Sequence, residues 1–499
     1  MRQLAILICS VLWINVIQSQ TMDQAYRFSG LDVQGTGRYL ALGSSMGAIG
    51  ADISTAAMNP AGLGFFRSSE FVITPGMGFT NIQSTLNGQQ GLSLDKTKSK
   101  FILGSTGMVN AREPQFSPKL KSAVFAIAAN RTADFNQSFT LRGNTNGSIV
   151  ERWTNLASGV EPDDLDGYET GLAYSTGAIF DPNNSLNYTN DFNTSGNYET
   201  SKLQIVTRKG GVTELDIAFA GNLQDKLMFG VNFGIPFLRY EEQKVYTEDD
   251  VNNEVKDANT TADFKSLTYG EYLNSSATGF NIKMGLIYRF AQAFRMGVAV
   301  HSPTWYGLKD AFGSDLNYDF TTNPALDPAP PYYDEFDGSY EYAMSTPWRF
   351  IGSLGSVISK FGFINADVEY VNYQGTKFNF NDVSGPSDII VEEALNRQID
   401  EQFQSAINLR IGAEIALMDF RLRGGFQLLG SPFEGDDNYR KALSGGVGFR
   451  HNSFYMDLGY RYMNQTESYI PYDPRGSTIQ AGVNDITNHQ VNLTFGFRY

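Results

Sequence analysis

Few side chains in this sequence have the types and spacing that acid–base, metal or nucleophilic chemistry requires. The histidines are His301, His451 and His489. They fall on different predicted strands and turns, so a shared metal site would need all three to converge in the fold. His301 by itself could serve as an axial haem ligand. The serine-nucleophile, phosphate-loop and zinc-protease motifs are absent from the sequence. We therefore predict a protein without catalytic residues, bound metal or cofactor.

The only cysteine, Cys9, lies inside an apolar stretch at the N-terminus. This stretch, residues 4–17, follows the basic residue Arg2 and precedes a polar Gln-Ser-Gln sequence, an order that is typical of a secretory signal peptide. A membrane anchor is the alternative, but the run is short for a membrane span. We expect residues 1–20 to be cleaved, which leaves an exported chain without disulfides or thiolate chemistry.

Composition and charge narrow the class of protein further. Aromatic residues make up 13% of the chain, glycines number 50 and hydrophobic residues reach only 41%, a combination that favours strands over helices. The net charge of −15 excludes a general nucleic-acid binder. No later stretch is apolar for long enough to form a transmembrane helix. Strands that cross an outer membrane alternate in polarity, however, and escape a hydropathy scan.

Alternation of apolar and polar residues is the dominant pattern of the chain. Short connections alternate with long ones, which is typical of an outer-membrane barrel with tight periplasmic turns and long extracellular loops. The sequence therefore predicts an all-β fold, a 14-stranded antiparallel transmembrane β-barrel in the cell outer membrane. The fourteen predicted strands are residues 70–80, 100–110, 120–132, 213–222, 226–240, 278–289, 294–305, 344–358, 362–373, 406–417, 420–429, 442–450, 454–464 and 489–499.

The C-terminal strand carries the pattern to the last residue. Val491, Leu493, Phe495 and Phe497 would face lipid, and the residues between them would face the lumen. Tyr499 would lie in the periplasmic aromatic girdle, where a terminal aromatic resembles the signal that the barrel insertion machinery reads. In a closed barrel this strand pairs with the first and leaves no edge. An edge strand of a soluble sheet is the alternative.

Residues 21–68 precede the first strand and do not alternate. Small residues dominate this segment, and they permit close packing in a confined space. We predict a plug in the barrel lumen, with one short helix that Asp52 or Ser54 caps and that Asn59 and Pro60 end. A second helix is predicted over residues 387–406, in the loop between the ninth and tenth strands.

The stretch LALGSSMGAIGADISTAAMNPAGLGFF, residues 40–66, resembles the N-terminal hatch of the FadL/TodX family of outer-membrane transporters. Residues 279–308 and 345–370 resemble two further hairpins of that family, and the signal ending and loop sizes look like its Bacteroidetes branch. The resemblance implies a signal peptide at 1–20, a hatch at 21–68 and a barrel at 69–499. The hatch residues that it implies are Gly43, Gly47, Asp52, Asn59, Pro60, Ala61 and Gly62.

The resemblance also implies a function, the passive uptake of hydrophobic or amphipathic small molecules such as long-chain fatty acids, by a monomer in contact with outer-membrane lipid. Arg38 would be a possible carboxylate partner, although pairing with a wall carboxylate is the alternative. Aromatic side chains of one predicted outside loop could capture the substrate, or could pack the loop's own core. These are Trp305, Tyr306, Phe312, Tyr332, Tyr333 and Phe336.

In the family the substrate leaves sideways through a gap beside a kinked third strand. The third strand here has no glycine or proline to form such a kink, so we predict only a break in its pairing near residues 128–130. Three other functions stay open at this point. They are a barrel that docks or shuttles components of a secretion system without transport, a haemin receptor, and a barrel enzyme that uses lumen-facing Asp, His and Ser.

Overall fold

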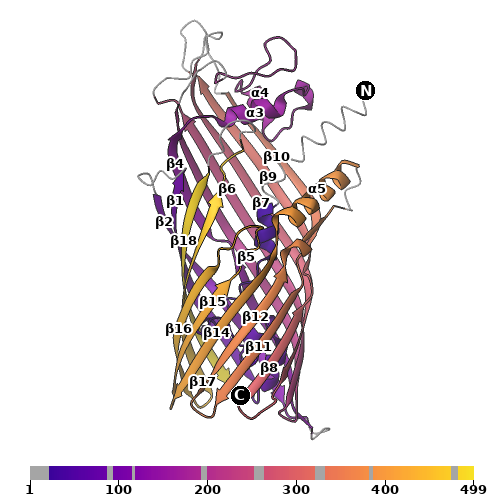
Figure 1. Ribbon diagram of the computed structural model, residues 1–499, viewed down its shortest axis with the longest axis vertical. Coiled ribbons are helices and arrows are strands. Elements are labelled where there is room, and N and C mark those ends of the chain that lie inside the picture. Colours follow the sequence, from indigo (N-terminus) through magenta and orange to yellow (C-terminus); the bar gives the residue numbers. More distant parts are fainter. Residues whose placement is uncertain are drawn as a thin grey trace.

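The computed structural model describes residues 22–86, 94–114, 119–192, 199–251, 263–320, 332–380, 386–473 and 481–499, so the expected signal peptide lies outside the described residues. One antiparallel sheet closes on itself, because the first strand pairs with both the second and the last (Figure 1). Its segments are β1 (Glu70–Leu86), β2 (Leu94–Arg112), β3 (Leu120–Asp134), β4 (Gln137–Thr145), β5 (Thr200–Leu223), β6 (Leu227–Asp249), β7 (Phe264–Tyr288), β8 (Phe294–His301), β9 (Trp305–Phe320), β10 (Tyr332–Ser345), β11 (Arg349–Ile358), β12 (Gly362–Asn372), β13 (Lys377–Asn379), β14 (Ser405–Leu417), β15 (Phe420–Leu429), β16 (Arg440–His451), β17 (Phe454–Tyr469) and β18 (Gly482–Arg498).

Within the described residues, eighteen segments form fourteen wall strands. β3 and β4 both pair with β5, and β8 and β9 both pair with β7, so each of these pairs is one interrupted strand. β10 continues into β11 and β12 into β13 in the same way. The prediction of a closed 14-stranded antiparallel barrel is therefore confirmed.

Two of the interruptions occur at prolines. Pro303 separates β8 from β9, and Pro347 separates β10 from β11. Proline has no backbone N–H for the ladder, and the strands are joined here by a bond from Thr346 N to Thr304 O at 3.0 Å. The predicted strands 294–305 and 344–358 are therefore each broken near one end, which alternation alone did not indicate.

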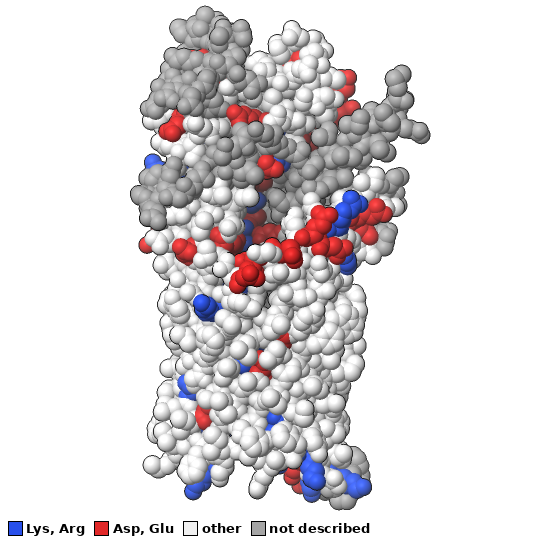
Figure 2. All heavy atoms as spheres, viewed as in Figure 1, with Lys and Arg blue, Asp and Glu red and all other residues white. Residues whose placement is uncertain are grey.

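The outer face of the barrel carries a belt of exposed apolar side chains. On β6, for example, Phe229, Phe233 and Phe237 point outward while Asn232 and Leu238 are buried. The belt spans about ten residues of each strand, which matches the roughly 25 Å apolar band of outer-membrane barrels. Figure 2 shows few charges over the lower half of the molecule and acidic side chains gathered above it. This is the architecture of a transmembrane barrel.

The C-terminal strand has the orientation that the sequence predicts. Asn492 and Thr494 are fully buried, and Phe497 is exposed on the outer face. Phe497 lies opposite Phe71 of β1, so the last strand closes the ring. The residues of β17 behave alike, because Asp457 is buried while Leu458 is exposed.

The described connections at the periplasmic end are short turns. Four of these turns each contain a residue in the left-handed backbone conformation, with φ between 49° and 58°. These residues are Asp225, Ser359, Met418 and Asn452. These turns, together with the C-terminus, lie at the lower end of the barrel in Figure 1, and the helices α3 (Ile149–Ala157) and α4 (Thr170–Ser175) lie at the other end.

The barrel wall extends beyond the apolar belt, and this corrects the predicted loops. Residues 241–277 and 306–343 were predicted as loops, yet most of them are strand, because β6 continues to Asp249 and β10 begins at Tyr332. The side chains still alternate there, but both faces are largely polar or aromatic. The stretch between the third and fourth predicted strands contains β4, α3 (Ile149–Ala157), η4 (Pro162–Asp164), α4 (Thr170–Ser175) and half of β5.

The helices follow the predictions in part. α5 (Pro386–Gln402) replaces the predicted helix at 387–406, with Leu395 and Ile399 fully buried, and a short η5 (Tyr373–Gly375) precedes β13. Residues 22–29 are helical and α2 (Gly37–Ala41) follows. The predicted short helix that Asp52 caps is the 3-10 helix η1 (Ile53–Ala57), and a second 3-10 helix, η2 (Pro60–Phe65), begins where the predicted one ends. No helix in the described ranges has the length and apolar character that crossing a membrane requires.

Met284, 59% exposed near the middle of the belt on β7, allows a test of this membrane position. Met284→Arg should lower the free energy of unfolding by about 2–4 kcal/mol, because a charge at mid-depth on the lipid face is desolvated. Reversible denaturant unfolding in lipid vesicles measures this difference. Val245→Arg is the control, since Val245 is exposed on the same face of β6 above the belt. Equal losses in the two variants would contradict the assignment of the belt.

Candidate functional site

Residues 22–66 lie inside the ring of strands and are almost entirely buried. Their charged side chains pair with side chains that point inward from the wall. Asp32 accepts hydrogen bonds from Arg461 of β17 at 2.6 and 2.7 Å, and Asp23 lies 3.2 Å from Arg208 of β5. Because leaving one buried charge unpaired is costly, these pairs fix the segment against the wall.

Two of the predicted hatch residues begin the short helices of this segment. Asp52 is the cap of η1 and also accepts a hydrogen bond from the Thr36 hydroxyl at 2.8 Å. Asn59 is the cap of η2, where its side-chain oxygen accepts from Ala61 N at 3.2 Å. The Asn59 amide group donates to Gly47 O at 2.7 Å. These side chains therefore tie successive turns of the segment together.

Gly47 lies against the side chains of Ser353 and Asp367, whereas other predicted hatch residues lie at close contacts with backbone atoms. A Cβ atom at Gly43 would lie 2.8 Å from the backbone nitrogen of Phe426 in β15, and one at Gly62 would lie 3.0 Å from Gly50 Cα. Pro60 packs on β6, where a Cβ atom at Gly230 would lie 2.4 Å from the Pro60 carbonyl carbon. At these positions only small residues permit the observed packing.

Arg38 is buried and fully engaged. It lies 3.4 Å from the Glu414 carboxylate of β14 and donates to Ala51 O at 2.6 Å. Glu414 also accepts from Arg423 at 2.7 Å, and Arg423 in turn donates to Asp457 at 2.6 Å. Arg38 is thus part of a charge network between the segment and the wall, the arrangement given above as the alternative to a carboxylate partner.

The wall is interrupted beside β3. Pairing between β2 and β3 ends at Ser105 and Asn130, so β2 above Ser105 pairs only with β1 among the described strands. Beyond Asn130 the carbonyls of β3 turn to the inner segment, where Asp32 N and Gln34 N donate to Thr132 O and Arg131 O at 2.7 and 2.8 Å. The predicted break near residues 128–130 is therefore confirmed.

The backbone feature that permits this bend is on the neighbouring strand. Pairing of β3 with β5 shifts register between Arg131 and Ala133 and ends where Asp134 lies opposite Gly211, next to Gly210. Both glycines have positive φ, 115° and 147°, and a Cβ atom on Gly211 would lie 2.3 Å from Ala133 O. The third strand itself contains no glycine or proline. The sequence signal for the bend is instead the adjacent glycine pair in β5.

Two lysines of β2 reach across the gap. Lys98 donates to Arg208 O of β5 at 3.0 Å, and Lys100 forms an ion pair with Asp134 at the end of β3. Phe101 follows Lys100 and faces outward below the two lysines, where its side chain is 70% exposed. The gap is thus closed by long side chains in place of backbone bonds.

The six aromatic residues proposed as a capture loop do not share one surface. Trp305 and Tyr333 are exposed on the outer face, whereas Tyr306 is buried and faces the lumen. Phe312 and Phe336 pack together with ring centroids 6.4 Å apart. The side chain of Tyr332 lies outside the described part of the chain. Strand alternation separates the set, because neighbours along β9 and β10 point to opposite faces.

The lumen above the inner segment contains two apolar clusters beside buried ion pairs such as Arg208–Glu242 and Lys202–Glu248. One cluster joins Phe28, Tyr240, Tyr342 and Phe378 to Leu395 of α5. A second cluster places α3 and α4 over the upper wall, with Trp153 and Tyr269 at a centroid distance of 5.4 Å. These clusters form an apolar interior between the long loops and the inner segment.

Charged groups complete the cap that α3 and α4 form. Arg152 donates to Glu169 at 2.8 and 3.1 Å. Burial raises the pKa of the Glu169 carboxyl, and the Arg152 guanidinium opposes that rise. The pair therefore connects the two helices in a largely dry environment.

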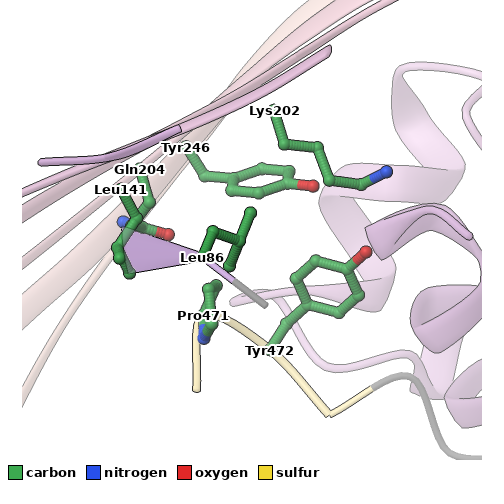
Figure 3. Close-up of a pocket in the computed structure, with 7 residues that line it drawn as sticks. All are labelled: Leu86, Leu141, Lys202, Gln204, Tyr246, Pro471 and Tyr472. Atoms are coloured by element: carbon green, nitrogen blue, oxygen red, sulfur yellow. The ribbon is translucent and has the colours of Figure 1, made fainter. Parts of the chain in front are cut away.

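A small pocket lies among side chains of β1, β4, β5 and β6 and of residues 471–472 (Figure 3). Its volume is about 10 Å³, which is space for one water molecule. Lys202 lies beside it and donates to Thr145 O at 2.6 Å. The lining residues are Leu86, Leu141, Lys202, Gln204, Tyr246, Pro471 and Tyr472.

The three histidines contact different parts of the protein and do not contact one another. His301 is 2% exposed and donates from Nε2 to Met58 O of the inner segment at 2.6 Å. His451 lies 3.6 Å from Asp419 at a periplasmic turn, and His489 contacts Tyr460. Within the described ranges no group of three His, Cys, Asp or Glu residues is placed to hold a metal ion.

Gly211→Ala tests the origin of the bend. A side chain at φ 147° that would also meet Ala133 O should lower the unfolding free energy by about 1–3 kcal/mol. Denaturant unfolding of the detergent-solubilised barrel measures this change. Gly424→Ala is the matched control, because a Cβ atom there has nothing within 4 Å. A loss no larger than that of the control would mean that the glycine is not needed for the bend.

Comparison with known proteins agrees with this geometry. No family model and no curated protein sequence matches the chain. Among solved structures, a FadL homologue of Pseudomonas aeruginosa superposes with a TM-score of 0.54 at 12% identity, covering 94% of this chain and 99% of that one. The toluene transporter TodX of P. putida has a TM-score of 0.54 at 11% identity, with the same coverages. The chain thus has the fold of the FadL and TodX outer-membrane proteins.

Proposed function

We propose that this protein is an outer-membrane channel for the passive uptake of hydrophobic or amphipathic small molecules, acting as a monomer and not as an enzyme. The observation that carries the proposal is the interruption of the wall at Asn130, where the inner segment replaces β2 as the partner of β3. Similarity to structures described as a FadL homologue and a toluene transporter supports the same class of cargo. In this proposal residues 1–20 are the signal peptide, 21–68 the hatch and 69–499 the barrel.

The physical reason for a lateral exit is the energy of hydration. A hydrophobic molecule gains about 25 cal/mol for each Å² of apolar surface removed from water. Passage into the periplasm would return that surface to water, whereas passage through the wall delivers it to lipid. The gap beside β3 begins at the upper edge of the apolar belt, where the outward-facing Phe101 of β2 is exposed.

The proposed route begins in the apolar interior under the long loops and ends at this gap. The hatch closes it through the bonds of Asp32 and Gln34 to β3. Movement of residues 32–34 would break two backbone bonds and expose the lumen-facing edge of the gap. A long-chain fatty acid is an amphipathic molecule of the kind that this route would accept. Its carboxylate would need a cation other than Arg38, because Arg38 is already bonded to Glu414 and Ala51.

Uptake of a fluorescent fatty acid and of a neutral aromatic hydrocarbon into proteoliposomes tests the proposal. Wild-type protein should accelerate the uptake of at least one probe over empty liposomes without an energy source. If neither probe enters faster, the transport function is wrong and a docking role is favoured. A titration with haemin, followed by its absorbance, tests the receptor alternative at the same time.

Lys100→Met tests the route. Loss of the Lys100–Asp134 pair should ease opening of the gap and raise the uptake rate by about two- to fivefold, since a partly exposed ion pair is worth up to roughly 1 kcal/mol. Lys226→Met, at an exposed periplasmic turn, is the control and should leave the rate unchanged. A Lys100 variant that transports at the wild-type rate would place the exit elsewhere.

A further inference from the structure

The outer face of the barrel has a hollow of about 680 Å³ that the proposed route does not use. It crosses β3, β5, β6, β7 and β9 and lies on the far side of β3 from the gap. Its lining combines glycines and other small residues with Phe237, Leu238 and three basic side chains. The lining residues are Arg131, Gly210, Gly211, Thr213, Phe237, Leu238, Arg239, Ser276, Ala277, Thr278, Gly307 and Lys309.

Strand register places the basic groups at one height. Arg239 of β6 is opposite Ser276 of β7, which is in turn opposite Lys309 of β9. These are outward-facing positions, as the alternation of burial along the three strands indicates. Arg131 of β3 lies opposite Thr213, at the edge of the same hollow.

The row lies just above the apolar belt. Two residues below it along the strands, Phe237 is opposite Thr278, and two residues further down Phe280 is opposite Trp305. Phe237, Phe280 and Trp305 are all exposed to the outside. Because Phe237 is ten residues from the periplasmic turn at Leu227, the basic row lies where the roughly 25 Å belt ends and lipid headgroups begin.

The basic side chains are available to a ligand in different degrees. Arg239 makes no ion pair with any residue in the described ranges. Arg131 is held in place by bonds to Gly210 O at 2.6 Å and Thr213 Oγ1 at 3.3 Å, and it also forms an ion pair with Asp134 at 3.8 Å. Lys309 pairs with Glu341 at 3.0 Å, but both side chains are more than 60% exposed, and such surface pairs are weak.

We propose that this hollow binds the phosphate group of a phosphorylated lipid in the outer leaflet. Arg131 and Arg239 would each offer planar N–H donors to the phosphate oxygens, Lys309 would add a third charge, and the hydroxyls of Thr213, Ser276 and Thr278 would donate as well. The exposed aromatic rings below would contact the acyl chains. Nearby carboxylates at Asp134, Glu241 and Glu341 reduce the positive field, so binding depends on donor geometry in addition to net charge.

A lipid source fits the position of the site better than free phosphate does. The hollow opens sideways at the edge of the apolar belt, where a lipid phosphate is held at high local concentration by its own acyl chains. Inorganic phosphate would meet the same donors without the contribution of Phe237, Phe280 and Trp305. The inference does not require that the barrel transports anything, only that its long-loop end faces the outside.

Native mass spectrometry of the full chain in mild detergent, titrated with bis-phosphorylated lipid A, tests the proposal. The wild type should bind this lipid at least about tenfold more tightly than the dephosphorylated form, since charged hydrogen bonds to phosphate are lost. Arg239→Gln combined with Lys309→Gln should abolish that preference. Ser276→Asp, which places a carboxylate between the two cations, should do the same and serves if the first variant does not fold.

The control removes two positive charges elsewhere on the upper outer wall. Arg142→Gln combined with Lys265→Gln alters exposed residues of β4 and β7 and should leave the preference within about twofold of wild type, because distant exposed charges are screened. Equal binding of phosphorylated and dephosphorylated lipid, or equal losses in the control, would overturn the proposal. Displacement of the lipid by inorganic phosphate at an equal concentration would overturn the assignment to a lipid.

Discussion

Every backbone amide that lies within hydrocarbon must find its partner in the protein, because water is absent and each unsatisfied group costs several kcal/mol. Closure of the sheet meets this constraint around most of the wall. Beside β3 it is met differently, since β2 stops pairing at Ser105 and the carbonyls of Arg131 and Thr132 accept from the inner segment. The inner segment is therefore a part of the wall's hydrogen bonding as well as a filling of the lumen.

The fit of that segment depends on glycines, which have no side chain, both in the segment and in the wall. Cβ atoms at Gly412, Gly425 and Gly459 of the wall would each lie within 2.3 Å of a backbone atom of residues 37–43. Backbone thus packs on backbone, and the polar atoms between are joined by bonds such as that from Gly37 N to the Thr494 hydroxyl at 2.7 Å. Apolar clusters also join the segment to the wall, since Ile53, Leu63 and Phe66 pack with residues of β1, β2 and β3. The segment is therefore held by apolar packing together with hydrogen bonds and ion pairs in a medium of low dielectric, and it can move only when several of these contacts exchange together.

Sequence periodicity predicts which face a residue occupies far better than it predicts what the residue pairs with. The inward positions of Asn492 and Asp457, the position of the periplasmic turns and the number of wall strands all follow from alternation and connection length. The upper halves of β6 and β10 were missed because their outer faces are no longer apolar once they leave the membrane. The bend of β3 was located but its cause was not, since the glycines stand on the strand that becomes its neighbour. Likewise Arg38 was recognised as a buried charge, but its partner Glu414 is 376 residues away in the chain.

One backbone irregularity explains two features of the upper wall. Gly210 and Gly211 let β3 shift register and turn inward, which opens the gap toward β2. The same two glycines present no side chains outward, which leaves part of the hollow on the other side of β3. Arg131 belongs to both features, because it follows the last residue paired with β2 and lies at the rim of the hollow. A phosphate bound to Arg131 would therefore hold β3 one residue from the point where the wall separates, so that lipid bound outside and the hatch bound inside act on the same short stretch of strand.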